Sequence, residues 1–323
     1  MGIVLVDEPR VSDEVDFEFS GSTNQLLGRF AKLRNKSAQQ SCNSVLDKCT
    51  GLSIRVQTPT LIDKYPKWTN ITGAIPNLFL RSAIFGIGNS KKLLIRKRIS
   101  GPAGFEIFVT GSKLTVNDLR YLDVLFQLAN SENTCRFTPY SFLKRMQKTD
   151  TGENYKALKI FFSRVMANSI EIIDRNGTNQ GYEGSIVVDK KTNENTGDTI
   201  VMLNPQLRQF FQKNSFTLLN MQIASEIRNH QLAFWLFGYY STHAQPFPLK
   251  VQTIHELCGS ESENIESFTQ CLKRALGKIK SAYIKNHKKF EWSISKGLVT
   301  VSRTASVSQN KSIAYKKIHR GKR

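Results

Sequence analysis

A basic stretch near the carboxyl end of the chain carries the side chains with the clearest chemical capacity. In residues 260–289 the apolar residues recur at steps of three and four, which places them on one stripe of an α-helix. The opposite face gathers hydrogen-bond donors, cations and one glycine: Ser267, Gln270, Lys273, Arg274, Gly277, Lys278, Ser281 and Lys285. Cations bind phosphate, and Gln and Arg make paired hydrogen bonds with adenine and guanine. This face therefore predicts binding to duplex DNA.

The segments around this helix predict the fold that presents it. Its start is expected at Ser260, because Glu263 three residues later completes a capping box. A short strand and helix in residues 246–259 precede it, and two β-rich runs joined by Lys296 and Gly297 follow it as a hairpin. This order predicts a winged helix, with Lys296 in the wing as a further DNA contact. The alternative is an amphipathic helix whose polar face is only solvated.

The same order of elements occurs earlier in the chain. Residues 137–146 predict a short helix after a strand, and residues 155–168 predict a long helix. An offset of 110 residues aligns Arg164 with Arg274, and the polar loop 190–198 takes the place of the wing. We expect this first long helix to bind DNA through four residues: Lys156, Lys159, Ser163 and Arg164.

Composition agrees with a polyanion as partner. The chain has 323 residues and a net charge of +20, and residues 76–323 hold 37 of the 46 cations but only 18 of the 26 acids. Such an excess favours nucleic acid or anionic lipid. No run of about 18 apolar residues is present, so neither a transmembrane helix nor a secretory signal is expected. The five cysteines lack CxxC spacing, which indicates a reducing cytoplasm.

Arrangements typical of an enzyme or a bound cofactor are missing from the sequence. The GIGNSK segment at residues 86–91 does not have the spacing of a phosphate-binding P-loop. His255 and Cys258 lie close together, but no second His or Cys pair completes a metal site, and Cys258 is expected in the core. We therefore expect a protein that is not an enzyme and that binds DNA without metal or nucleotide.

The remaining segments complete an α+β architecture of two tandem winged-helix domains. The domains are expected at residues 71–214 and 215–305. The acidic arm before them, residues 1–70, is expected to be flexible, and the basic tail 306–323 is expected to be a disordered arm that contacts phosphate.

Four further elements are predicted inside these domains. Pro76 at a first turn predicts a helix over residues 76–87. Residues 93–110 predict a hairpin, residues 117–129 a helix, and residues 222–242 one long helix buried between the domains.

Several of these segments resemble the opening signature of the TrfA family of plasmid replication initiators. They are PNLFLRSAIFG at residues 76–86, GFEIFVTG at 104–111, KLTVNDL at 113–119 and CRFT at 135–138. The similarity extends more weakly over residues 70–305. The resemblance implies binding to repeated duplex sites (iterons) at a plasmid origin and origin opening in the bacterial cytoplasm. It also implies three host partners: the host initiator, the replicative helicase and the sliding clamp.

Some features of this interpretation stay open. The clamp-binding motif of the family is only approximated by NQLLGRF at residues 24–30, and QLAFW at residues 231–235 lies in a predicted core helix. A monomer–dimer equilibrium is neither required nor excluded. A transcriptional repressor is the main alternative, and an origin-nicking enzyme with a tyrosine nucleophile is a weaker one.

Overall fold

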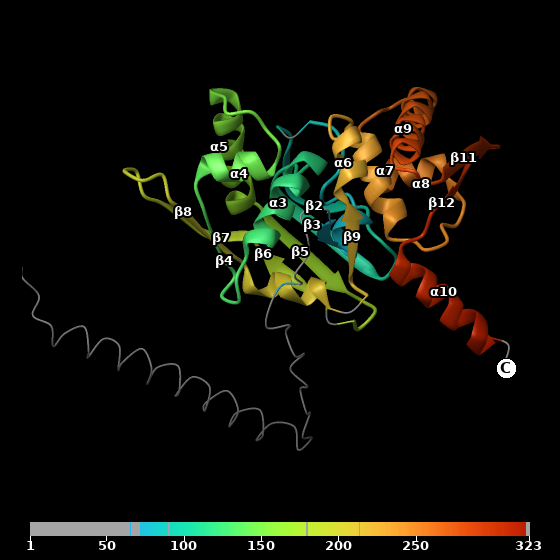
Figure 1. Cartoon of the computed structure of the whole chain (residues 1–323), viewed down its shortest axis with the longest axis horizontal. Coiled ribbons are helices and arrows are strands. Elements are labelled where there is room, and N and C mark those ends of the chain that lie inside the picture. The colour runs from blue at the N-terminus through green and yellow to red at the C-terminus, as the bar shows by residue number, and fades with distance from the viewer. Residues whose placement is uncertain (1–64, 66–71, 90, 179, 213, 321–323) are drawn as a thin grey trace, which may run out of the picture. The chain divides into compact units, whose positions relative to one another are not determined.

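The structure is a computed structural model, and it confirms the α+β class (Figure 1). It describes residues 65, 72–89, 91–178, 180–212 and 214–320. The predicted N-terminal arm lies outside the described residues apart from Tyr65, whose side chain is buried against Phe126 and Phe211. None of the described helices combines the length and the apolar character needed to cross a bilayer.

The first helix–hairpin unit, residues 134–203, contains a strand, a short helix, a long helix and a hairpin. These elements are β4 (Thr134–Phe137), α4 (Pro139–Arg145), α5 (Gly152–Ala167), β7 (Val187–Thr192) and β8 (Thr199–Leu203). The three strands form a sheet in the order β4-β8-β7, so the strand before the short helix pairs with the second strand of the hairpin.

The second helix–hairpin unit, residues 249–303, repeats this plan. Its elements are β10 (Leu249–Lys250), α8 (Val251–Leu257), α9 (Ile265–Lys285), β11 (Phe290–Ser295) and β12 (Leu298–Arg303). The sheet order β10-β12-β11 matches that of the first unit position for position. The internal similarity predicted from the sequence is therefore present in both the order and the pairing of the elements.

A four-stranded antiparallel sheet is attached to the first unit. Its order is β2-β3-β5-β6, built from β2 (Leu93–Ile99), β3 (Phe105–Ser112), β5 (Ser169–Asp174) and β6 (Tyr182–Gly184). The predicted hairpin of residues 93–110 is confirmed by β2 and β3. Strand β5 follows α5 directly and pairs with β3. The chain therefore contributes β5 and β6 to this sheet before it forms the hairpin β7–β8.

A two-stranded pairing connects the two halves of the described chain. Strand β1 (Thr72–Pro76) pairs antiparallel with β9 (Phe216–Asn220). Helix α3 (Val116–Leu128), predicted at 117–129, packs against β1, while a 3-10 helix at Pro205–Phe211 precedes β9. The predicted domain boundary at residue 214 falls between these two paired strands and remains a prediction.

The helix predicted over residues 76–87 is much shorter than expected. Only Asn77–Leu80 (α2) is helical, because the following amides bond outside the helix. Ala83 N–H donates to the Ser100 carbonyl at 2.8 Å, and Ile87 N–H donates to the Cys258 carbonyl at 2.9 Å. These tertiary hydrogen bonds replace the helical ladder.

The long helix predicted over residues 222–242 is two helices, α6 (Met221–Ile227) and α7 (Gln231–Ser241). His230 has an extended backbone and donates its amide to the Ile227 carbonyl, so the chain turns there. Helix α7 is buried over most of its surface, as its nearly continuous apolar sequence predicts.

The basic tail, predicted to be disordered, forms a helix, α10 (Val307–Arg320). Its start is fixed by reciprocal hydrogen bonds: Ser306 N–H donates to Gln309 Oε1 at 3.0 Å, and Gln309 N–H donates to Ser306 Oγ at 3.3 Å. This Ser-x-x-Gln capping box is visible in the sequence and signals the helix start. Gln309 Oε1 also accepts from Arg303 Nη2, which anchors the helix to β12.

One ionisable group in the core lacks full compensation. Asp123 on α3 is 3% exposed, and its Oδ2 accepts from Gln127 Nε2 at 3.0 Å while Oδ1 has no partner. Burial raises the pKa of this carboxyl to about 7. Since the folded-state pKa is raised, stability linked to the protonated form is complete below the ordinary pKa of 3.8 and is lost as the pH rises through 7.

Asp123→Asn is therefore expected to stabilise the protein at pH 8 but not at pH 4, because the amide is neutral at both. The gain in the free energy of unfolding at pH 8 is at most about 4 kcal/mol. Urea denaturation at the two pH values measures it, with the exposed Glu194→Gln as control. A gain of the same size at both pH values would contradict this account.

Candidate nucleic-acid interface

Helix α9 begins one turn later than predicted. Asn264, not Ser260, is the N-cap: its Oδ1 accepts from the amides of Glu266 at 2.8 Å and Ser267 at 3.1 Å. Ser260 and Glu261 instead belong to the turn before the helix. Glu266 in the first turn complements the positive end of the helix dipole.

The predicted division of α9 into two faces is confirmed by burial. The buried stripe consists of Phe268, Leu272, Ala275, Leu276, Ile279, Ala282 and Tyr283. On the opposite face Ser267, Gln270, Lys273, Arg274, Lys278, Ser281 and Lys285 are all exposed. Gly277 lies on the same face, and a Cβ added there would meet no atom within 4 Å. The residues predicted to bind DNA therefore share one exposed surface.

The cations of this surface differ in how they are held. No ion pair in the described part of the chain involves Lys273, Arg274 or Lys278. Lys285 differs, because its Nζ lies 2.8 Å from Glu226 Oε2 on α6. That pairing draws Lys285 toward the protein, and three cations remain free for an anion.

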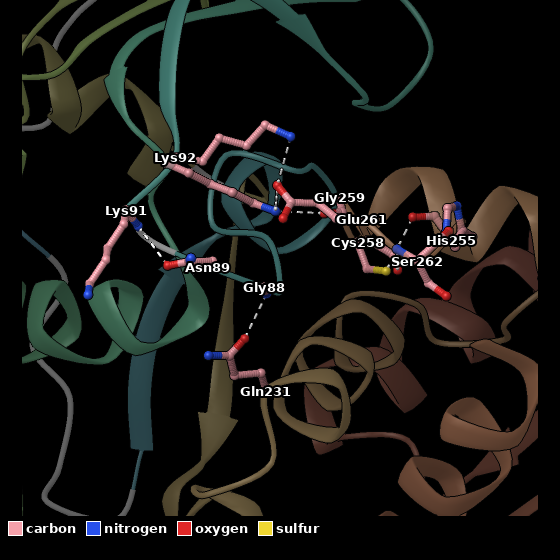
Figure 2. A network of polar contacts seen from close by, with 12 residues as sticks. Gly88, Asn89, Lys91, Lys92, Gln231, His255, Cys258, Gly259, Glu261 and Ser262 are labelled. Carbon is pink, nitrogen blue, oxygen red and sulfur yellow. Dashed lines mark hydrogen bonds and ion pairs between the residues drawn. The ribbon is translucent and has the colours of Figure 1, made fainter. Parts of the chain in front are cut away.

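The turn that leads into α9 is fixed by a polar network from the N-terminal sheet (Figure 2). Lys113 is 7% exposed, and its Nζ donates to the Gly259 carbonyl at 2.8 Å and to Glu261 Oε1 at 3.2 Å. Lys92 Nζ lies 3.3 Å from the same carboxylate oxygen. Two cations thus hold one carboxylate, which sets the position at which α9 begins.

Further contacts in Figure 2 join this turn to α8 and join the loop at Gly88 to α7. His255 Nε2 bonds to the Ser262 carbonyl at 2.8 Å, and Gly88 N–H donates to Gln231 Oε1 at 2.8 Å. Cys258 is fully buried, as predicted, and burial raises the pKa of its thiol to about 12. His255 and Cys258 are thus explained by packing and hydrogen bonding.

The hairpin of the second unit turns at Lys296 and Gly297, as predicted. Both residues have positive φ, 49° and 73°, which is typical of the two-residue turn that connects twisted strands. Lys296 is exposed at this turn. Its side chain is therefore exposed at the tip of the hairpin that follows α9, and its contact with DNA stays a prediction.

Helix α5 presents a smaller cationic face than predicted. Lys156, Lys159 and Ser163 are exposed, and Ser163 Oγ donates to the Lys159 carbonyl at 3.1 Å. The first two therefore match the prediction of exposed cations on the first long helix. Lys190 and Lys191 on β7 add positive charge in the neighbouring hairpin.

Arg164 corrects the prediction that it lies on this exposed face. Its side chain is 17% exposed, and Nη2 forms an ion pair with Asp118 Oδ1 on α3. Asp118 is fully buried and also accepts from the Thr115 amide and hydroxyl through Oδ2. The offset of 110 correctly aligns buried Phe162 with buried Leu272. It does not carry over the exposure of the arginine, because Arg274 is exposed while Arg164 is paired with Asp118.

Arg164→Ala is expected to lower the free energy of unfolding by about 3 kcal/mol, because it leaves the buried Asp118 carboxylate without its cation. Arg274→Ala, at the matched position of α9, should change it by less than about 0.5 kcal/mol. Urea denaturation of the two variants makes the comparison. Equal stabilities would show that the Asp118 pair contributes nothing and would return Arg164 to the DNA-binding set.

Three arginines outside the predicted set also gather in the structure. Arg120 on α3, Arg145 on α4 and Arg228 after α6 line one surface pocket. They come from separate elements with no common spacing, so no motif in the sequence signals them.

The QLAFW segment is placed where the sequence predicted. It forms the first turns of α7, where Ala233, Phe234 and Trp235 are buried and Gln231 accepts the bond from Gly88. This segment cannot act as an exposed linear motif in the folded chain. The other candidate, residues 24–30, lies outside the described residues.

Each helix–hairpin unit thus presents exposed cations on its long helix, and comparisons with known proteins show the family to which the chain belongs. The model of the TrfA protein family matches residues 31–292, so the chain belongs to the TrfA family. It is 23% identical over 266 residues to the plasmid replication initiator protein TrfA of Escherichia coli, which covers 78% of this chain and 68% of the relative.

A solved structure of another protein shares the fold. Domains 2 and 3 of RctB match with a TM-score of 0.50 at 13% sequence identity, over 72% of this chain and 97% of that one. The Pi initiator protein in complex with iteron DNA matches with a TM-score of 0.46 at 11% identity, over 58% of this chain and 91% of that one.

Proposed function

We propose that this protein initiates plasmid replication by binding iterons in duplex DNA at the origin. The observation that carries the DNA-binding part is the exposed face of α9, where Lys273, Arg274 and Lys278 are free of ion pairs among the described residues. Such a face, in a chain of net charge +20, attracts the phosphate backbone. Membership of the TrfA family supports the replication part.

In this proposal each helix–hairpin unit is a winged helix. The shared element order and the shared sheet order support this assignment. Helices α5 and α9 then enter successive major grooves, and the hairpins β7–β8 and β11–β12 act as wings. The two parts of one binding site would lie about one helical turn, roughly 34 Å, apart along the duplex.

Within α9 the proposal divides base reading from phosphate binding. Gln270 and Arg274 lie one turn apart on the exposed face and can make paired hydrogen bonds with adenine and guanine, each worth about 1–3 kcal/mol of discrimination. The open space above Gly277 lets the helix approach the base pairs closely. Lys278, further along the helix, is assigned to phosphate.

Arg274→Ala and Gln270→Ala are each expected to relax specificity at one base pair, because each removes one paired contact. Lys278→Ala removes one charge from the same face and should weaken all sequences about equally. Binding-site selection from a randomised duplex, followed by sequencing, separates these effects. An unchanged preferred sequence at lower affinity would reassign Arg274 to phosphate.

We further propose that the protein is not an enzyme and acts by binding alone. Binding to the iterons would open adjacent AT-rich DNA and bring in the host initiator, the replicative helicase and the sliding clamp. Because the QLAFW segment is buried in α7, a clamp contact would have to use another surface or the segment at residues 24–30.

Permanganate footprinting on a supercoiled origin plasmid tests this proposal. Purified protein, without ATP or metal, is expected to make thymines reactive beside the repeats. Protection of the repeats without any reactive thymines would favour the repressor. A covalent protein–DNA product at a nick would favour the nicking enzyme.

A further inference from the structure

The pocket lined by Arg120, Arg145 and Arg228 has the size of a site for one small group. Its volume is about 80 Å³, far below the roughly 300 Å³ at which small-molecule sites begin. Arg120 and Arg228 are partly buried, while Arg145 is exposed at the rim. A single charged group fits such a pocket better than a whole metabolite does.

The positive charges of this pocket are not neutralised. Arg120 Nη1 donates to the Arg228 carbonyl at 3.3 Å, and Arg228 Nη1 donates to the Gln147 carbonyl at 3.3 Å. Each guanidinium has five N–H donors, so most remain for a ligand. No ion pair in the described ranges involves any of the three arginines.

The closeness of Arg120 and Arg228 is electrostatically unfavourable, because two positive charges repel each other. Burial, together with the neighbouring Arg228 charge, lowers the pKa of the Arg120 guanidinium. A bound anion would offset both the burial and the repulsion. Because a guanidinium fork matches tetrahedral oxyanions, phosphate is the anion that this geometry favours.

Asp123 also lines the pocket, and its charge would oppose an anion. None of the ion pairs among the described residues joins it to one of the three arginines. Since its pKa is about 7, the carboxyl is mostly protonated at pH 6. In that form the carboxyl carries no negative charge, so Asp123 does not exclude phosphate.

We propose that this pocket binds one phosphate group and that the backbone of bound DNA supplies it, an assignment of source that rests on the proposed function. Arg145 ends α4 just before the turn into α5, while α6 is tied to α9 by the Glu226–Lys285 pair. The pocket is lined by residues of α3, α4 and α6, and α4 contacts α5 while α6 contacts α9. The pocket thus lies between the two proposed recognition helices, where the backbone between successive major grooves is expected.

The test compares two charge-matched double variants of the full chain at pH 6. One is Arg145→Gln with Arg228→Gln. The other is Lys97→Gln with Arg98→Gln on β2, which removes two exposed cations that do not line the pocket. Affinity for specific and random duplexes is measured over a range of salt concentrations. Inorganic phosphate is titrated separately without DNA while the melting temperature is followed.

The pocket variant is expected to lower the slope of log K against log salt by about 0.9, the value for one phosphate, without changing the preferred sequence. The β2 variant should leave the slope near that of the wild type. Arg145 makes no described hydrogen bond or ion pair on which folding depends. Arg145→Gln alone should therefore fold and should lower the slope by part of this amount. It therefore keeps the test valid should the double variant fail to fold.

Other outcomes decide the remaining possibilities. An unchanged slope, with inorganic phosphate stabilising the wild type but not the pocket variant, would keep the phosphate site and make its source a free ligand. No effect in either measurement, an equal loss in the β2 variant, or a changed sequence preference would overturn the proposal. Absence of specific DNA binding by the wild type would instead defeat the proposed function, and the phosphate titration would still report on the pocket.

Discussion

The antiparallel pairing of β1 with β9 is the constraint on which the arrangement of both helix–hairpin units depends. It joins the strand that precedes the first unit to the strand that leads toward the second, with Thr72 opposite Asn220 and Pro76 opposite Phe216. Ala74, Ile75 and Leu219 are buried at this pairing. Because α3 packs on β1 and α6 begins where β9 ends, the strand pair fixes both helices that flank the arginine pocket.

Helix α9 does not depend on its exposed cations for folding. Its buried stripe, the Asn264 cap and the network around Lys113 and Glu261 hold it in place. Lys273, Arg274 and Lys278 can therefore repel one another at the surface without loss of the fold. Removing the core interactions and removing the surface charges are separable changes, which is the property expected of a recognition helix.

The sequence was sufficient for the elements whose signal is local. Apolar residues at helical or alternating spacing predicted α3, α5, α9 and the hairpins β2–β3 and β11–β12, because burial of one face imposes that spacing. The predicted helix ends were wrong where tertiary contacts decide between two locally acceptable positions. Ser260 and Asn264 are both acceptable caps, but Glu261 is held by Lys113 and Lys92, so the helix begins at the later one. Likewise, hydrogen bonds to distant carbonyls ended α2 after Leu80.

The exposure of the charged residues in the candidate site likewise depends on tertiary contacts that the sequence pattern does not reveal. The repeat correctly placed Phe162 and Leu272 in equivalent buried positions, because packing periodicity belongs to the helix itself. Whether an arginine next to that stripe faces solvent depends on what lies opposite, and Asp118 on α3 captures Arg164 while Arg274 meets no carboxylate among the described residues. An internal repeat therefore transfers core positions more reliably than charged ones. If α5 binds DNA, it has to do so with Lys156, Lys159 and its neighbouring hairpin, so the two helices would contribute unequally to reading a site.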